Sequence, residues 1–586
     1  MRVFFIGRLT VRALLLCAIF FSFACGSPDE VAKTGSGEDV HDASTGEFAS
    51  EHKEGGVEKL GDVWILPVEV KGFEKLDLLQ KKKVYERYEA ALKEDDLFYR
   101  NNDPQSMRTR IMLEQILLND KGVPPSIRRK IRSYTVSFWL NRGAVDVPGE
   151  RCLRPRFIPG ELAAAAQQAL RNGAVMDLPT MTGNLGATRI QELEALLSAV
   201  RPGIFCESNR GKEPGGDAGA DTQAPQTDSL QDDRSVGEIV GIENAGQAGV
   251  FASLEKKAVV LDRLVRNVGG KKSASPRRPS RSPRSVDVVS ATGAYGPIPS
   301  GSINIYRRGA WIDSMGTGAL YMSNLEASFE RFVGSTIVEE FSSSAQVLAR
   351  RKKWRKGSRI AVFALRLIAG SASDGTEKKP AGWLRTRLLE THDVIAQMRA
   401  DLAALYLVAS DHVRKTGLVP DEESAHAVYD EYVCGVFEQS ASGIGTDEAG
   451  FLASRAVVGK LIESRAVEVV TAEDDSGRLF PIIVNYEIME ETIEKLLAKV
   501  RKIRFAGDRP EAKALLDSAS QAYDPKWAKH FMERWKALEL PSKVAFLYPL
   551  IEQVRDGEGV VVDIRLVKPA AFVDRQLTLA AARSPE

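Results

Sequence analysis

Apolar residues recur at helical spacing through the first ordered part of the chain. Between residues 76 and 97 the apolar positions include Leu78, Leu79, Val84, Tyr88, Ala91 and Leu92. This spacing of three to four residues places them on one face of a helix. Residues 108–118, 161–170 and 190–200 follow the same pattern. We therefore expect an N-terminal helical lobe over residues 60–206.

The composition changes after this lobe. Residues 207–235 are rich in Gly, Gln, Pro and acidic residues and contain almost no large apolar side chain, which is typical of a linker. A helical island at 248–268 precedes a basic, Pro/Ser-rich run at 271–284, which we interpret as a solvated loop rather than a phosphate-binding one. Residues 207–292 are thus predicted to be a low-complexity linker with one helix. Residues 293–566 are predicted to form a C-terminal lobe, and residues 567–586 a tail.

The N-terminus has the pattern of an export signal. Arg2, Arg8 and Arg12 precede the apolar run 13–23, which is too short to span a bilayer comfortably. Small residues precede Cys25 and a polar tract follows it, which resembles a bacterial lipoprotein, although Ser22 and Phe23 depart from the usual lipoprotein pattern. We predict a signal peptide over 1–24, lipidation of Cys25 and a flexible tether over 25–59. The alternatives are plain secretion and an uncleaved anchor at 13–23. Each of them places the protein in the exported fraction or at the cell envelope.

Composition and charge exclude several classes of protein. The 586 residues include 80 Lys and Arg against 79 Asp and Glu, so the net charge of +1 argues against a nucleic-acid partner. Five cysteines exclude a disulfide-built scaffold, and six histidines restrict any metal site. The common hydrolase, phosphate-loop and zinc-peptidase motifs are absent. Cys434 lies between valines and is predicted to be a buried structural thiol.

Several short motifs occur in the order found in one peptidase family. They are Trp139-x-Asn141-x-Gly143, Gly296-Pro297-Ile298-Pro299, Ile303-Asn304-Ile305, Trp311-Ile312, Val338-Glu339-Glu340-Phe341, Arg399-Ala400-Asp401-Leu402 and Gly507-Asp508. Their shared order resembles the dipeptidyl-peptidase III family, whose members are zinc exopeptidases that release dipeptides. The resemblance implies an α+β fold: helix-rich and two-lobed, with a small β-core near 296–345 and a cleft between the lobes.

The residues at the family's zinc positions do not suit zinc. Aligned on Gly370, Arg366 and Ser371 take the places of two histidine ligands, and Leu367 takes that of the catalytic glutamate. Aligned on Arg399, Gln397 replaces the third ligand, and Phe451 falls on a further family histidine. Catalytic zinc needs three protein ligands and a base for its water. Since no histidine occurs between residues 53 and 391, we predict no cofactor, although the family implies zinc.

Three functions remain open for such a chain. The first is a catalytically inactive homologue that binds or regulates peptides at the strand edge Ile303, Asn304 and Ile305. The second is a structural interaction module at the cell envelope. The third is an active peptidase or hydrolase with an unrecognised site, for which the charged candidates are Arg366, Asp401, Glu339 and Glu340. We favour ion pairing that replaces the metal as the role of these four residues, with lipid as the link to the membrane.

Overall fold

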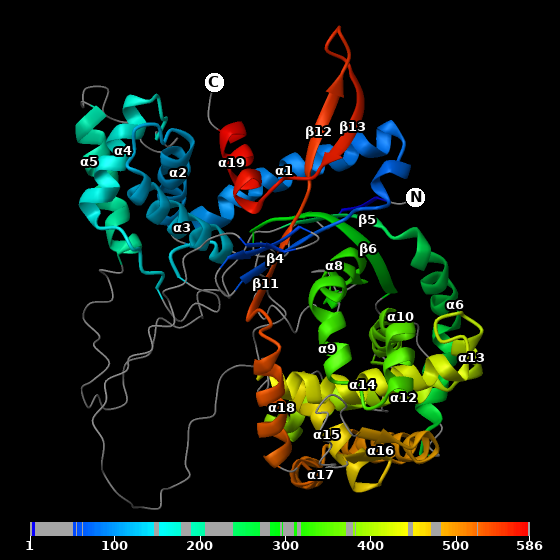
Figure 1. Cartoon of the computed structure of the whole chain (residues 1–586). Helices are drawn as coiled ribbons and strands as arrows, with labels where there is room; N and C mark the ends of the chain where they lie inside the picture. The colour runs from blue at the N-terminus through cyan, green and yellow to red at the C-terminus, as the bar shows by residue number, and fades with distance from the viewer. Residues whose placement is uncertain are drawn as a thin grey trace, which may run out of the picture.

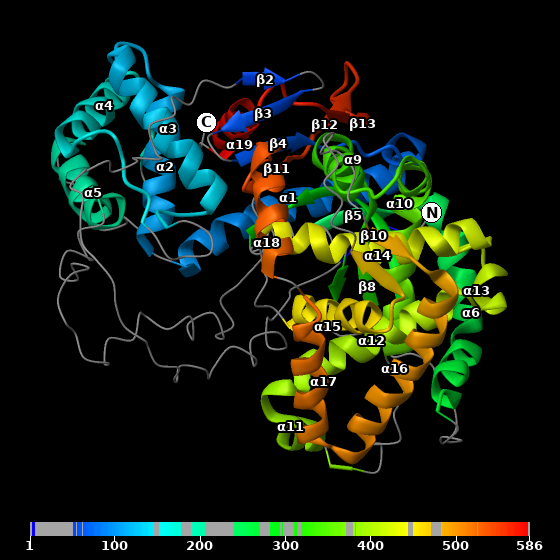
Figure 2. The ribbon, with the colours of Figure 1, turned by 60° about the horizontal axis from the view of Figure 1, so that its bottom comes forward.

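The computed structural model describes residues 3–5, 51–53, 56–60, 63–102, 104–145, 152–176, 189–205, 238–269, 282–293, 296, 310–312, 318–370, 379–380, 382–443, 449–469, 482–523 and 525–583. They form a helix-rich α+β fold with two hydrophobic cores, one in each lobe (Figures 1 and 2). Among these residues, no helix combines the length and the apolar character needed to cross a membrane.

The smaller lobe is helical, as the spacing of apolar residues predicts. It contains α2 (Pro104–Leu118), α3 (Pro125–Asn141), α4 (Pro159–Arg171) and α5 (Arg189–Ile204), which gather at one end of α1 (Leu78–Asn102) (Figure 1). The core between them includes Met112, Phe138 and Leu162. Pro159 begins α4, and the Glu161 carboxylate accepts a hydrogen bond from the backbone N of Ile158 at 3.0 Å, which satisfies one free donor at the helix start.

A five-stranded sheet lies between the lobes, with the strand order β1-β5-β6-β8-β7. Its strands are β1 (Val3–Phe5), β5 (Ile239–Glu243), β6 (Ser282–Ala291), β7 (Ala310–Ile312) and β8 (Gly318–Met322). Strands β6 and β8 are parallel, and the other neighbours are antiparallel. Helix α6 (Ala245–Asn267) connects β5 to β6 and confirms the helical island expected at 248–268.

Residues 207–292 are predicted to be a linker, and this is wrong for residues 239–243 and 282–291, because β5 and β6 belong to the central sheet. The β-core therefore begins upstream of residue 296. Val286, Val288 and Val289 are buried in β6, yet the basic, proline-containing run before them hides the strand pattern. Burial of these valines stabilises β6, and β6 in turn pairs with β5.

A second sheet joins the two ends of the chain. Its order is β11-β4-β3-β2, with β2 (Glu51–Lys53), β3 (Val57–Leu60), β4 (Val63–Pro67) and β11 (Lys543–Leu547). Strands β4 and β11 are parallel and pair Val63 with Lys543. Strand β2 and most of β3 lie in the segment expected to be a tether, so that prediction is wrong over 51–53 and 57–59. The buried Val57 gives this segment an apolar anchor that its polar composition conceals.

The C-terminal segment is also ordered, contrary to the tail expected at 567–586. The hairpin of β12 (Leu550–Arg555) and β13 (Val561–Val567) projects from the body, and α19 (Phe572–Arg583) returns to it (Figure 1). Phe572 and Val573 are buried in the core of the smaller lobe. Arg583 donates to both carboxylate oxygens of Glu114 on α2 at 2.9 Å. One apolar helix face and the ion pairs of Arg583 therefore dock α19 on the smaller lobe.

The larger lobe surrounds one long helix, α10 (Ala345–Gly370), which packs against α12 (His392–Val408) and α14 (Glu422–Ser442). Helices α15 (Ala449–Glu463), α16 (Tyr486–Ala506), α17 (Arg509–Gln521) and α18 (Pro525–Ala537) complete the lobe (Figure 2). Short elements precede α10: α8 (Ser323–Phe329), the π-helical turn η5 (Glu330–Gly334) and α9 (Ser335–Glu340). Further short elements are η1 (Phe73–Lys75), α11 (Trp383–Leu388), η6 (Leu389–Thr391), α13 (Asp411–Arg414), β9 (Val467–Val469) and β10 (Ile482–Val484).

A close helix contact in this lobe gives the first testable prediction. A Cβ atom on Gly459 of α15 would lie 2.2 Å from the carbonyl oxygen of Ala519 on α17, so the two backbones would have to separate. We expect Gly459→Ala to lower the free energy of unfolding by about 1–3 kcal/mol. The matched control is Gly435→Ala in α14, where nothing lies within 4 Å of the added atom.

The control should leave stability unchanged or raise it by about 0.5–1 kcal/mol, because alanine favours a helix interior over glycine. Denaturant unfolding of the two variants and of the parent chain measures the difference. Equal stability of Gly459→Ala and the parent would show that α15 and α17 do not pack as described.

Candidate functional site

Two of the residues that the resemblance places at the family's zinc positions, Arg366 and Gln397, meet at the end of α10. Arg366 on α10 donates from Nη2 to the Gln397 side-chain oxygen at 2.7 Å, and its Nε lies 2.8 Å from Oδ1 of Asp401. Gln397 and Asp401 are four residues apart on α12 and therefore lie on one helix face. Asp401 is fully buried, and the Arg366 side chain is 22% exposed. The predicted pairing of Arg366 with Asp401 is present.

The second oxygen of Asp401 is also occupied. The hydroxyl groups of Tyr432 on α14 and Ser454 on α15 both donate to Oδ2, each at 2.9 Å. Burial, and then the negative charge of Asp401, raise the pKa of Tyr432 well above its usual value, so this phenol stays protonated. One carboxylate thus holds α10, α12, α14 and α15 together, and both of its oxygens are engaged.

An arginine of α12 reinforces this junction. Arg399 is buried, and its Nη1 donates to the carbonyl oxygen of Ala369 at 2.6 Å. Ala369 lies in the last turn of α10, where carbonyl groups lack partners within the helix. The positive charge of Arg399 also suits the negative end of the helix dipole. The Arg399-Ala400-Asp401 motif therefore anchors the end of α10 from two sides.

The other residues selected from the sequence do not join this cluster. Leu367 packs against the main core, and Phe451 is buried within it. Glu339 pairs with Lys352 at 2.5 Å on the surface, and Glu340 pairs with Arg534 at 2.7 Å. Ser371, Cys25 and the strand-edge residues Ile303, Asn304 and Ile305 lie outside the described residues.

Cys434 is buried, as its valine neighbours predict. Burial raises the pKa of its thiol to about 12, so it carries no thiolate at neutral pH. A nucleophilic cysteine needs a lowered pKa and access to solvent. Cys434 therefore acts as a packing residue of α14.

The residues at the end of α10 do not fit a zinc ion. A guanidinium group cannot donate an electron pair to a metal, and a positive charge about 4 Å from a divalent ion repels it by about 8 kcal/mol at an effective dielectric constant of 20. Gln397 and Asp401 already accept hydrogen bonds or ion pairs from Arg366. Within the described ranges, no three His, Cys, Asp or Glu side chains gather closely enough to hold a metal ion.

A larger set of buried ion pairs runs along α10 from this point. Arg351, Arg355 and Arg359 follow at intervals of four residues and are buried on one face. The carboxylate of Glu431 on α14 lies 2.9 Å from Arg351, 3.4 Å from Arg355 and 2.9 Å from Arg359. These three cations hold the pKa of Glu431 well below its usual range, against the effect of burial.

Further acids complete this set, which we call the α10 arginine row. Glu438 of α14 lies 2.5 Å from Arg351, Glu330 of η5 lies 3.0 Å from Arg355, and Glu326 of α8 contacts Arg359. The sequence signal was the four-residue spacing of the arginines. Their partners were not predictable, because Glu431 is 80 residues away from Arg351 in the chain.

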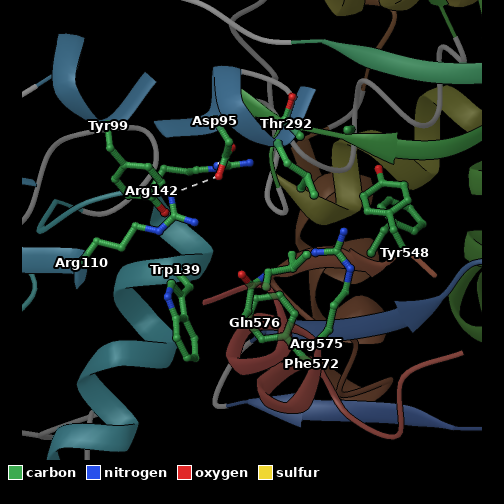
Figure 3. Close-up of a pocket in the computed structure, with 14 residues that line it drawn as sticks. Asp95, Tyr99, Arg110, Trp139, Arg142, Thr292, Tyr548, Phe572, Arg575 and Gln576 are labelled. Atoms are coloured by element: carbon green, nitrogen blue, oxygen red, sulfur yellow. Dashed lines mark hydrogen bonds and ion pairs between the residues drawn. The ribbon is translucent and has the colours of Figure 1, made fainter. Parts of the chain in front are cut away.

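A small pocket lies where the two lobes meet (Figure 3). Its volume is 30 Å³, which at about 10–15 Å³ for each water-sized probe is room for about two water molecules. The lining side chains come from α1, α2, α3, the end of β6, β11 and its continuation, and α19; those with polar groups include Asp95, Tyr99, Arg110, Trp139, Arg142, Tyr548, Arg575 and Gln576. The pocket is far too small for a peptide.

The charge on Asp95 in this pocket is stabilised by three donors. Its carboxylate pairs with Arg142 and with Arg110, the latter at 3.2 Å, and accepts a hydrogen bond from the backbone N of Gly293 at 2.8 Å. These contacts hold the pKa of Asp95 below its usual range although burial opposes ionisation. Sequence reasoning missed this cluster, because its members come from segments that are far apart in the chain.

The pKa of Glu238 is raised, whereas that of Asp95 is lowered. It begins the central sheet beside Thr292, and its side chain faces Glu94 and Arg87 of α1. Burial, with a smaller effect of Glu94, raises the pKa of Glu238 to about 7. Raised carboxyl pKa values occur at catalytic sites and at plain structural positions alike. The raised pKa makes the ionised form of Glu238 costly in the folded chain, which is a stability effect that can be measured.

Comparison with known proteins identifies the fold of this chain. No family model matches the sequence, and no curated protein matches it. The solved structure of DPP III from Caldithrix abyssi superimposes with a TM-score of 0.54 at 16% identity, over 83% of this chain and 98% of that chain. Dipeptidyl-peptidase III from Corallococcus sp. strain EGB gives a TM-score of 0.45 at 14% identity, over 83% and 95% of the two chains. The match to the Caldithrix abyssi structure shows that the chain has a dipeptidyl-peptidase III-like fold, which confirms the fold predicted from the motif order.

Loss of Arg366 tests the role of the ion pair at the end of α10. We expect Arg366→Ala to lower the free energy of unfolding by about 2–3 kcal/mol, slightly less than for a fully buried pair because Arg366 is partly exposed. The control is Lys352→Ala on the same helix, which breaks an exposed pair with Glu339 and should change stability by less than about 1 kcal/mol.

Thermal and denaturant unfolding report both values. Adding Asp401→Asn to Arg366→Ala should cost less than the sum of the single changes, because the second change removes the charge that the first leaves unpaired. Strict additivity, or an unchanged stability of Arg366→Ala, would contradict a direct pairing.

The raised pKa of Glu238 predicts an unusual pH dependence. Unfolded, this carboxyl loses its proton near its ordinary pKa of 4.5, but folded it does so at about 7. Its contribution to stability therefore falls as pH rises from 4.5 to 7 and remains unfavourable above that. We expect Glu238→Gln, which imitates the protonated acid, to raise the melting temperature at pH 8 by about 2–4 °C and to have little effect at pH 4.

The control is Glu558→Gln on the exposed turn of the β12–β13 hairpin, which should not alter the pH profile. Melting curves of both variants from pH 4 to pH 9 give the comparison. A Glu238→Gln variant that is less stable than the parent at pH 8 would show that the carboxylate is stabilised rather than strained.

Proposed function

We propose that this protein is an exported, dipeptidyl-peptidase III-like protein that binds peptides and does not hydrolyse them through zinc. The observation that carries the proposal is the contact of Arg366 with Gln397 and Asp401. These residues stand at or beside the positions that align with zinc ligands. An arginine that neutralises Asp401 can do the structural work of a metal ion but cannot activate water.

Peptide binding in this proposal uses the central sheet. Strand β7 lies at the end of the described strand order, with β8 on its other side, so one of its edges has no described neighbour. An extended peptide can add to such an edge through backbone hydrogen bonds, while alternate side chains enter pockets. Ile303, Asn304 and Ile305 precede β7 in the chain and are the proposed binding segment.

Export has one supporting observation in the folded chain. Cys152 is disulfide-bonded, and disulfides persist mainly in oxidising compartments outside the cytosol. Strand β1 falls within the proposed signal segment, so a mature chain that begins at Cys25 would lack it. In the lipid-anchored form, Cys25→Ser should move the protein from the membrane to the soluble exported fraction. Unchanged membrane association would favour an anchor at 13–23 instead.

A structural interaction module is the second candidate function, favoured by the projecting hairpin. Val560 is 56% exposed and Val562 is 48% exposed at the tip of β12 and β13, which stands away from the body (Figure 1). Exposed apolar residues on a protruding hairpin can contact another protein. Val560→Ser with Val562→Ser would remove such a contact without touching the peptide-binding segment.

A combined binding and hydrolysis assay tests the peptide-binding proposal. Fluorescently labelled pentapeptides should show saturable binding by polarisation, and mass spectrometry should recover them uncleaved after incubation with added Zn²⁺. An active dipeptidyl-peptidase III serves as the positive control for cleavage. Release of dipeptides, sensitive to a chelator, would contradict the proposal.

Two variants make this assay specific. Asn304→Pro removes a backbone donor from the proposed edge and should abolish binding, while the hairpin pair Val560→Ser and Val562→Ser should leave it intact. The variant with Arg366→His, Leu367→Glu, Ser371→His and Gln397→Glu restores the family's residues at the ligand positions. We expect this variant to remain inactive, so the readout is bound metal. Zinc retained by this variant but not by the parent would support the assignment of Arg366 to a former ligand position.

A further inference from the structure

The pocket between the lobes contains a buried arginine without a carboxylate partner. Arg575 lies in the first turn of α19 and is 7% exposed, and its Nε is buried without a hydrogen-bond acceptor. Among the described residues, no carboxylate lies within ion-pair distance of it. Figure 3 shows its side chain reaching from α19 into the pocket, toward the side where Tyr548 lies.

The other charges around the pocket are already matched. Arg110 pairs with Asp95, Asp96 and Glu114, while Arg142 pairs with Asp95. Arg583 pairs with Glu114 at 2.9 Å and with Asp96 at 3.8 Å. Four guanidinium groups therefore face three carboxylates, and the excess positive charge belongs to Arg575. The Nε of Arg142 is a second buried donor without an acceptor in this cluster.

The surroundings make an uncompensated charge here costly. Trp139, Phe572 and Leu579 contribute apolar surface to the pocket wall. A buried ion without a counter-charge is strongly unfavourable, so a folded protein pairs it, neutralises it or supplies an ion from solution. Burial already lowers the pKa of Arg575 from its usual value, yet a guanidinium keeps its proton at neutral pH.

We propose that this pocket binds one small monovalent anion of halide size, with Arg575 as its main ligand and Arg142 as a second donor. The pocket has room for about two water molecules, which suits an ion of this size. The ion would bridge α19 to the helices of the smaller lobe and to the central sheet. The proposal is independent of peptide binding, because it concerns a different set of residues.

Thermal unfolding at constant ionic strength tests this site. Chloride replaces gluconate stepwise as the salt, with the full chain at neutral pH. Because a ligand bound only by the folded state stabilises it, the melting temperature should rise and saturate with chloride. In Arg575→Met the chloride-dependent rise should be lost. In Arg565→Met, which removes an exposed arginine on β13, it should remain.

Other anions and a direct probe complete the test. Bromide should also stabilise the parent chain, since it carries one charge at nearly the size of chloride, whereas sulfate should show no Arg575-dependent effect. The ³⁵Cl resonance should broaden with the parent chain and at least tenfold less with Arg575→Met. If that variant does not fold, bromide anomalous scattering from crystals of the parent chain locates the ion. A chloride effect that does not saturate, equal effects in both arginine variants, or no bromide at Arg575 would overturn the proposal.

Discussion

The packing of the larger lobe depends on one constraint: each arginine that α10 buries has to lie next to a carboxylate. Arg351, Arg355 and Arg359 share Glu431, and Arg366 meets Asp401. An uncompensated buried charge costs several kcal/mol, so α8, α12 and α14 have to lie where their acids reach α10. Ion pairs of this kind add little net stability over apolar packing, but they penalise every arrangement that separates the partners. We infer that the α10 arginine row and the separate Arg366–Asp401 pair together fix how these helices sit against one another.

The sequence could predict the features that depend on residues close together in the chain, and it could not predict those that depend on distant ones. The helices of the smaller lobe were predictable because apolar spacing alone specifies them, and the motif order indicated the dipeptidyl-peptidase III-like fold that the comparison with DPP III from Caldithrix abyssi shows. The Arg366–Asp401 contact was predictable because the resemblance aligned both residues. Strand β6 and helix α19 were missed, since basic composition hid the buried valines of one and proximity to the chain end hid the apolar face of the other. The partners of the arginine row are distant in sequence, and a single sequence carries no signal for them.

The two lobes meet through elements from both ends of the chain. Strand β4 pairs with β11, and α19 packs against α2 and places Arg575 in the junction pocket. In that pocket, as along α10, nearly every buried guanidinium is paired with a carboxylate. The need to neutralise buried charge therefore operates in both places. Charge pairs within the chain therefore hold the dipeptidyl-peptidase III-like framework together both along α10 and at the junction of the lobes.

The central claim is that an arginine–carboxylate pair stands where the family's alignment places zinc. Metal analysis of the purified full chain tests it most directly: the protein is equilibrated with excess Zn²⁺, freed of unbound metal by gel filtration and measured by mass spectrometry of the elements. The account predicts no stoichiometric zinc. One zinc ion per chain that resists gel filtration would contradict it.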